Sequence, residues 1–253
     1  MNSIIEALWC IVSPLIPTKT SKKGRPEYDN KKSFEGIMFV LEEGIRWKSL
    51  SKTVFGKPST IHGKFIKWSR NGLFNEMFSL IRKHYNSKEG CIDNWLAVDT
   101  SSRAAPFYKN AGKNPTDRGK RGVKYVVAVD REGAPLYVDI GSANTHDSQL
   151  IDSILKQLSD KKIIKILAAD SAFDSQKLYK QATNLNIALV ASPNKRRNKN
   201  KEGLQPSKYR WVVERSISHF MWNRGLKPAY FKLHVSLLSI FQLAAAIRVF
   251  KML

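Results

Sequence analysis

The sequence has little cysteine and no long apolar run. Two of its 253 residues are Cys, which argues against a disulfide-stabilised scaffold and fits a reducing compartment. The five histidines are scattered, and no Cys/His spacing typical of a structural zinc site is present. The most apolar stretch, 235–247, contains Ser239 and Gln242 and is too short to span the ~30 Å of hydrocarbon in a bilayer. Glu6 interrupts an apolar run at the N-terminus, and no basic segment precedes that run, so we expect no signal peptide.

Acidic residues are also scarce. The chain has 21 Asp and Glu against 43 Lys and Arg, a formal net charge of +22. An excess of positive charge of this size is self-repulsive unless a polyanion neutralises it. Nucleic acid is the commonest such partner, and an anionic membrane surface is the alternative. With 42% hydrophobic and 10% aromatic residues the chain can bury a core, which excludes wholesale disorder. Its length predicts one or two domains.

The first third of the chain reads as helical, and we predict a small all-helical domain over residues 1–88. Apolar residues recur at helical spacing in 33–43, and Gly44 ends that helix. Ser59 and Thr60 are predicted to cap a second helix, which Asn71-Gly72 ends.

The remainder, 89–253, has the pattern of an α/β domain. Three strands come first, and strands then alternate with helices, which predicts a mixed sheet with helices on both faces. The predicted strands are 95–99, 124–130, 135–140, 165–169 and 187–191. One helix is predicted to begin near Asp147, which can cap it. Three further helices are predicted over 175–185, 208–222 and 236–251.

Three carboxylates occupy informative places in this order. Asp99 lies within the first strand, Asp170 at the end of the fourth, and Glu214 on the helix after the fifth. An Asp in or at the end of an apolar strand is costly unless it is paired or binds a metal. Mg²⁺ prefers such oxygen ligands, and two Mg²⁺ ions can clamp an in-line displacement at phosphorus. The three acids therefore predict a metal-dependent phosphoryl-transfer site.

Plainer interpretations exist for two of these acids. Asp170 can serve as a turn or helix cap, and Glu214 can pair with Arg210 one helical turn earlier. Arg before Glu is, however, the weaker order for such a pair. The occurrence of all three acids in this strand order, in a chain of charge +22, favours the functional interpretation.

With these residues identified, the chain resembles the DDE-type transposases of bacterial insertion sequences, specifically insertion sequence family five. The resemblance runs from about residue 24 to the end of the chain. The segments that carry it are Gly24-Arg25-Pro26, 44–50, 59–61, 65–68, 122–125, 130–135, 144–148, 169–175 and 212–215. Each match is short, but all occur in the expected order.

The resemblance implies a ribonuclease-H-like catalytic domain preceded by the helical DNA-binding domain. It places the catalytic and metal-binding triad on Asp99, Asp170 and Glu214. It also implies Mg²⁺, with Mn²⁺ as a possible substitute, for cutting terminal inverted repeats and transferring strands into target DNA. A homodimer on double-stranded DNA in the cytoplasm, with no membrane partner, is expected. Arg210 fits a basic position of a related family, and Thr100 replaces a Gly common in relatives.

Two other functions remain open at this stage. One is a nuclease with the same site that hydrolyses nucleic acid without strand transfer. The other is a non-catalytic DNA-binding protein derived from a transposase, although an intact triad of acids favours an enzyme.

Several basic residues are predicted to contact DNA. Lys64, Lys67 and Arg70 recur on one side of the second helix, which predicts a recognition helix, with an ordinary solvated basic face as the alternative. Two basic loops and the residues around Glu214 supply further contacts, although a mobile solubilising loop remains credible for the later one. These contacts are Lys120, Arg121, Lys195, Arg196, Arg197, Arg210 and Arg215. For Trp211 and Trp222 we expect core packing rather than stacking on an extruded base.

Overall fold

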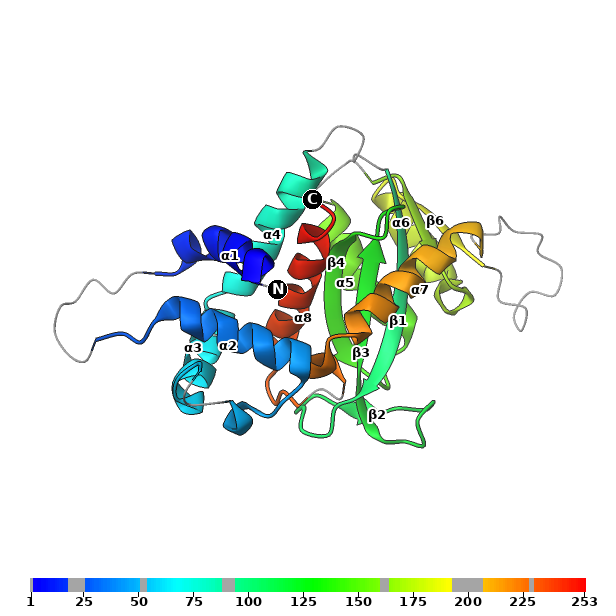
Figure 1. Ribbon diagram of the computed structural model, residues 1–253. Coiled ribbons are helices and arrows are strands. Elements are labelled where there is room, and N and C mark those ends of the chain that lie inside the picture. The colour runs from blue at the N-terminus through cyan, green and yellow to red at the C-terminus, as the bar shows by residue number, and fades with distance from the viewer. Residues whose placement is uncertain are drawn as a thin grey trace.

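The computed structural model describes residues 2–17, 26–50, 54–87, 94–159, 164–192, 207–227 and 230–253. A group of N-terminal helices lies beside a mixed sheet, and the C-terminal helix lies between the two parts (Figure 1). The N-terminal helices are α1 (Asn2–Val12), α2 (Asn30–Glu43), α3 (Pro58–Arg70) and α4 (Leu73–Asn86). Short 3-10 turns cover η1 (Ser13–Leu15) and η2 (Trp47–Ser49).

The ends of the N-terminal helices follow local chemistry. Asp29 caps α2 by accepting a hydrogen bond of 2.8 Å from the Lys31 backbone N–H. Gly44 ends α2 at φ +65°, as predicted. The predicted caps of α3 are wrong: the N-cap residue is Lys57, and α3 begins at Pro58, whose fixed φ and missing N–H suit the first helical position.

The sheet confirms the predicted mixed architecture. Its strands are β1 (Trp95–Ala104), β2 (Gly112–Lys113), β3 (Arg121–Val129), β4 (Pro135–Ser142), β5 (Ile166–Ala169) and β6 (Ala188–Ala191). β1 pairs antiparallel with β3 and parallel with β5, and β5 pairs parallel with β6. The other edge of β3 pairs antiparallel with β4 and with the short β2. This order, with β1 central, is that of a ribonuclease-H-like sheet.

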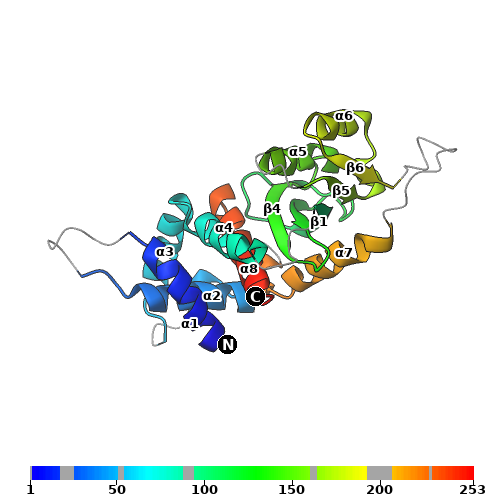
Figure 2. The same ribbon diagram turned by 90° about the horizontal axis from the view of Figure 1, so that it is seen from above.

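Helices cover both faces of the sheet. They are α5 (Asp147–Ser159), α6 (Gln176–Asn184), α7 (Ser207–Met221) and α8 (His234–Phe250), with 3-10 turns η3 (Ser171–Phe173) and η4 (Arg224–Leu226). Figure 2 shows α5 and α6 on one face of the sheet and α7 on the other. In the described part of the chain, no helix combines the length and apolarity needed to cross a membrane.

One hydrophobic core runs through both parts of the molecule. α8 packs against α3 and α4 on one side and against β4 on the other. Phe241 of α8 contacts the rings of Tyr125 and Phe220, and Gln242 donates a hydrogen bond of 3.0 Å to Asn75 of α4. The C-terminal helix thus fixes the N-terminal helices to the sheet. The domain boundary at residue 88 stays a prediction.

Candidate active site

The strand register places two of the predicted acids next to each other. β1 and β5 are parallel, and Ala97 of β1 lies opposite Ala168 of β5. Asp99 and Asp170 each follow two residues later. Since side chains alternate along a strand, both acids are expected on the same side of the sheet, at the end of the β1–β5 pair.

Helix α7 carries Glu214, and Arg210 of the same helix links Glu214 to Asp170 through ion pairs. The Arg210 guanidinium lies 3.3 Å from the Asp170 carboxylate and 3.2 Å from the Glu214 carboxylate. The charges of Arg210, Asp170 and Glu214 all act on Asp99. The structure therefore gathers the three predicted acids around Arg210, on the α7 side of the sheet.

Asp99 and Asp170 are partly buried, whereas Glu214 is exposed. Burial raises the pKa of Asp99 from its ordinary 3.8 to about 6. A hydrogen bond of 2.7 Å from the Thr100 backbone N–H and the Arg210 charge oppose this rise. The negative charges of Asp170 and Glu214 add to it. Asp99 is thus a carboxylate held in a site that disfavours its charge.

This burial predicts a pH-dependent stability. Because the pKa of Asp99 is higher in the folded than in the unfolded chain, the folded chain loses stability as pH rises from about 4 through 6. With metal removed by a chelator, Asp99→Asn should raise the free energy of unfolding by about 2–3 kcal/mol at pH 7. It should change this free energy little at pH 4. Urea unfolding at both pH values measures the difference, and an equal gain at both would refute this assignment.

The donor set suits a divalent cation, although the side chains do not form a closed metal cage. Among the described residues, no three His, Cys, Asp or Glu side chains lie close enough together to hold an ion. The Arg210 guanidinium pairs with both Asp170 and Glu214. Two carboxylates that pair with Arg210, and a third that senses the charges of all three groups, nonetheless supply the oxygen ligands that Mg²⁺ prefers.

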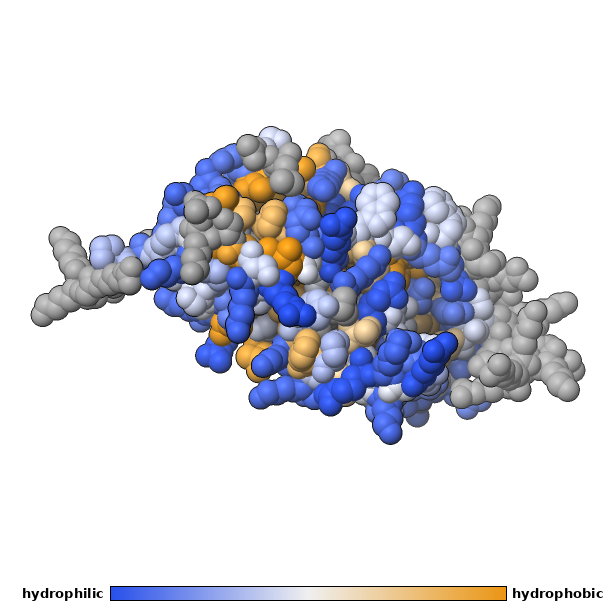
Figure 3. All heavy atoms as spheres, turned by 60° about the horizontal axis from the view of Figure 1, so that its bottom comes forward, coloured by the Kyte–Doolittle hydropathy of each residue, from blue (hydrophilic) through white to orange (hydrophobic). Residues whose placement is uncertain are grey.

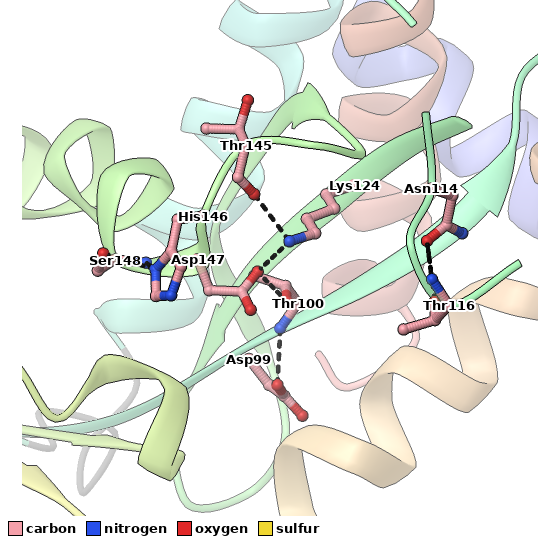
Figure 4. Close-up of polar contacts among 9 residues, drawn as sticks. All are labelled: Asp99, Thr100, Asn114, Thr116, Lys124, Thr145, His146, Asp147 and Ser148. Carbon is pink, nitrogen blue, oxygen red and sulfur yellow. Dashed lines mark hydrogen bonds and ion pairs between the residues drawn. The ribbon is translucent and has the colours of Figure 1, made fainter. Parts of the chain in front are cut away.

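A polar network lies on the opposite face of the same strands (Figure 4). Asp147 accepts a hydrogen bond of 2.9 Å from the Thr100 hydroxyl and pairs with the Lys124 ammonium at 2.8 Å. Lys124 also donates to the Thr145 carbonyl at 2.8 Å. Asp147 begins α5 as predicted, but its side chain joins α5 to β1 and β3. This network was not predicted from the sequence, although Thr100 and Lys124 are both polar residues within apolar strands.

The structure corrects one residue of the predicted recognition helix. The Lys64 side chain is buried and is bound by the Tyr28 carbonyl and the Asn30 amide oxygen. Glu27 lies 3.5 Å from its ammonium, and burial lowers the pKa of Lys64. Lys64 therefore fastens α3 to the segment before α2 and is not free to contact DNA. Lys67 and Arg70 are exposed on α3.

The other predicted DNA contacts have varied surroundings. Lys120 is exposed and pairs with Asp117 at 3.2 Å. Arg121 is exposed and donates to the Tyr108 carbonyl at 2.9 Å. Arg215 is exposed and donates to the Glu132 carbonyl at 3.0 Å. Lys195, Arg196 and Arg197 lie outside the described residues.

The predicted core packing of two tryptophans on and after α7 is wrong. Trp211 is 54% exposed and Trp222 is 76% exposed. The buried side of α7 consists of Val212, Val213, Ser216, Ile217, Phe220 and Met221. Trp211 lies outside this stripe, and the Arg215 guanidinium covers its ring at 4.7 Å.

Comparisons with known proteins match both parts of the chain. Residues 4–78 match the family described as "Putative transposase of IS4/5 family (DUF4096)", and residues 93–246 match "Transposase DDE domain". Among solved structures, the chain is similar to the BIV integrase catalytic core, with 13% identity and a TM-score of 0.31. That match covers 50% of this chain and 65% of the integrase chain. A pre-cleavage Mos1 transpososome matches with 11% identity and a TM-score of 0.30, over 94% of this chain and 82% of the other.

Two relatives come from an insertion element of Burkholderia cepacia. The "Insertion element IS402 uncharacterized 16.2 kDa protein" is 27% identical over 118 residues, which are 44% of this chain and 80% of the relative. The "Putative transposase for insertion sequence element IS402" is 34% identical over 120 residues, which are 43% of this chain and 55% of the relative. The chain thus spans about half the length of this second relative. Because the DDE-domain match covers more than half of the chain, the protein belongs to the family of DDE-domain transposases.

Proposed function

We propose that this chain is a DNA transposase that binds the terminal inverted repeats of an insertion sequence, cuts DNA strands there and joins them to target DNA in the cytoplasm. The observation that carries the proposal is the gathering of Asp99, Asp170 and Glu214 around Arg210. A protein that only binds DNA gains nothing from three acids at one point, because they repel phosphate. Family membership supports the same conclusion.

Asp99, Asp170 and Glu214 would hold Mg²⁺, with Mn²⁺ as a substitute. When bound, such ions activate the attacking oxygen and stabilise the leaving oxygen at one phosphate. One of these carboxylates lies in β1, one directly follows β5 and one lies on α7, and Asp99 lacks an ion-pair partner among the described residues.

The residues of the chain prepare this site in three ways. Arg210 lies within ion-pair distance of the Asp170 and Glu214 carboxylates and positions both side chains. The Thr100 N–H orients the Asp99 carboxylate from its own strand. The Asp147–Lys124 pair fixes Thr100 from the other face of the sheet. These contacts hold the acids in place before DNA arrives.

DNA binding is assigned to exposed basic residues. Lys67 and Arg70 on α3 are proposed to select the terminal DNA, and Lys120, Arg121 and Arg215 to contact phosphates. Since each chain has one site and an element has two ends, a homodimer on DNA is expected.

The selection of terminal DNA by α3 can be tested directly. Changing Lys67 and Arg70 together to Ala should lower the preference for terminal over random DNA by at least about tenfold, or about 1.4 kcal/mol. Competition binding measures this preference. As a matched control, Lys120→Ala should flatten the salt dependence of log affinity by about 0.9 and leave the preference intact. Uniformly weaker binding in the α3 variant would assign its cations to phosphate contact instead.

The cutting and joining activity is tested with DNA that flanks the coding region. The purified chain is incubated with that DNA and a target plasmid in Mg²⁺, and strand ends are mapped. We expect breaks at inverted repeats and joined products. Breaks without joined products would identify a nuclease, and intact DNA would refute the proposal.

A further inference from the structure

A cavity of about 480 Å³ lies away from the carboxylates, and none of the three acids lines it. It is bounded by η2, by the loop after β1 and by the segment before α8. Phe107 of that loop follows Asp99 along β1, and a strand rise of about 3.3 Å per residue places the end of β1 roughly 17 Å from Asp99. The cavity is thus separate from the candidate active site but lies along the same strand.

The cavity has aromatic walls. Phe107 and Tyr230 face each other with ring centroids 5.9 Å apart, and they are 53% and 41% exposed. Trp47 forms part of the lining, and its ring packs 5.0 Å from the rings of His62 and Phe65. Large exposed rings are costly in water unless a partner covers them, so this aromatic group indicates a binding surface.

The charges around these rings all have one sign. Arg46, Lys48 and Lys232 line the same cavity, and all three are exposed. None of the described lining residues is a carboxylate. Figure 3, in which the bottom of the Figure 1 view comes forward, shows hydrophobic residues between hydrophilic ones on that face of the molecule. Such a surface can bind a ligand that has a flat ring, which stacks on the aromatic side chains, and an adjacent anionic group, which pairs with the cations.

The walls are held in place by contacts between distant segments. The Lys109 N–H donates to the Lys232 carbonyl at 3.0 Å, and the hydroxyl of Tyr108 lies 2.8 Å from a ring nitrogen of His234. The loop that carries Phe107 is therefore fastened to the segment that carries Tyr230. A cavity fixed in this way needs little rearrangement when a ligand enters.

We propose that this cavity binds an unpaired nucleobase of single-stranded DNA, with its phosphates on Arg46, Lys48 and Lys232. This proposal rests on the proposed function, since strand cutting exposes unpaired nucleotides. Base stacking on aromatic side chains tolerates any base, and cations beside the rings follow the backbone. A duplex presents its phosphates to such a surface but keeps its bases within the stack. An acidic segment of a protein partner would offer charge without the flat ring that these walls fit.

The test compares single-stranded and duplex DNA with the full chain. Fluorescently labelled oligothymidine and a duplex of matched length are titrated with wild type and with the Phe107→Ala, Tyr230→Ala double variant. Loss of both rings should weaken single-strand binding by about tenfold or more and leave duplex binding unchanged. Phe107→Tyr with Tyr230→Phe keeps both rings and should keep wild-type affinity. Trp222→Ala removes an exposed ring elsewhere and should also change nothing.

The position of the base is measured by photocrosslinking. Oligothymidine that carries one 5-iodouracil should crosslink to Trp47, Phe107 or Tyr230, as located by mass spectrometry. Crosslinks only at other residues would overturn the proposal.

Other results separate this proposal from the proposed function. If wild type cuts terminal DNA but ring loss leaves single-strand affinity unchanged, the nucleobase site alone is wrong. If wild type binds neither DNA form, the proposed function fails as well. If ring loss converts a dimer to a monomer without changing single-strand affinity, the cavity is a contact between chains.

Discussion

Asp99→Asn, Asp170→Asn and Glu214→Gln are each expected to reduce metal-dependent cleavage of terminal DNA by at least about a thousandfold. Each change keeps the shape of the side chain and removes its negative charge, so it isolates the electrostatic role. Binding of terminal DNA should persist, because the DNA-selecting cations lie on α3. Single-turnover cleavage and a separate binding assay measure the two effects.

Combined changes and one matched variant sharpen this prediction. Double variants of the three acids should be no worse than single ones, because residues that act as a unit are not additive. Asp174→Asn should retain activity, since Asp174 hydrogen-bonds to Tyr179. Asp174 does not cap α6, whose N-cap residue is Ser175. A variant that cleaves at a near wild-type rate would remove its residue from the site.

Gly44→Ala is expected to cost about 2–5 kcal/mol of unfolding free energy, through backbone strain and overpacking together. Gly44 has φ +65°, and an added Cβ would lie 2.6 Å from the Arg224 backbone carbon. The Arg224 backbone belongs to η4, which packs against the end of α2. This contact is part of what fixes the N-terminal helices to the rest of the molecule, so its loss should lower the thermal transition.

Substitutions at two other glycines distinguish the effect of backbone strain from the effect of overpacking. Gly72 has φ +77° with no atom within 4 Å of an added Cβ, so Gly72→Ala should cost only about 1–2 kcal/mol of strain. Gly63 lies within α3, also with open space, so Gly63→Ala should stabilise the chain by up to about 1 kcal/mol. Chemical denaturation of the three variants measures the series. Equal effects at Gly44 and Gly72 would show that the approach of η4 to α2 does not matter.

The positions of Asp99 and Asp170 relative to their strands were predictable, because an apolar strand is a local pattern. Asp99 lies within β1 and Asp170 directly follows β5, and the parallel pairing of these two strands brings the two acids together. The ion pairs of Arg210 with both Asp170 and Glu214 depend on where α7 crosses the sheet. Of these two pairs, only the one with Glu214 follows from the sequence, because the position of a helix on a sheet is not a local property.

The burial of Lys64 is indicated by its position on α3, contrary to its predicted role in DNA binding. Lys64 follows Ile61 by three residues and precedes Trp68 by four, so it lies on the buried side of α3. Its ammonium is balanced by Glu27 and by the Tyr28 carbonyl, which are far away in sequence. Trp211 is exposed although it is a large apolar residue. Its neighbours Val212 and Val213 point into the core instead and are buried.

Cleavage of terminal DNA that carries sulfur in place of one non-bridging oxygen at the cut phosphate tests the central claim most directly. Mg²⁺ prefers oxygen ligands, and Mn²⁺ accepts sulfur more readily. The account predicts that sulfur slows single-turnover cleavage in Mg²⁺ and that Mn²⁺ restores the rate. Cleavage that is equally fast with oxygen and sulfur in Mg²⁺, or that persists with a chelator, would contradict a metal site built from Asp99, Asp170 and Glu214.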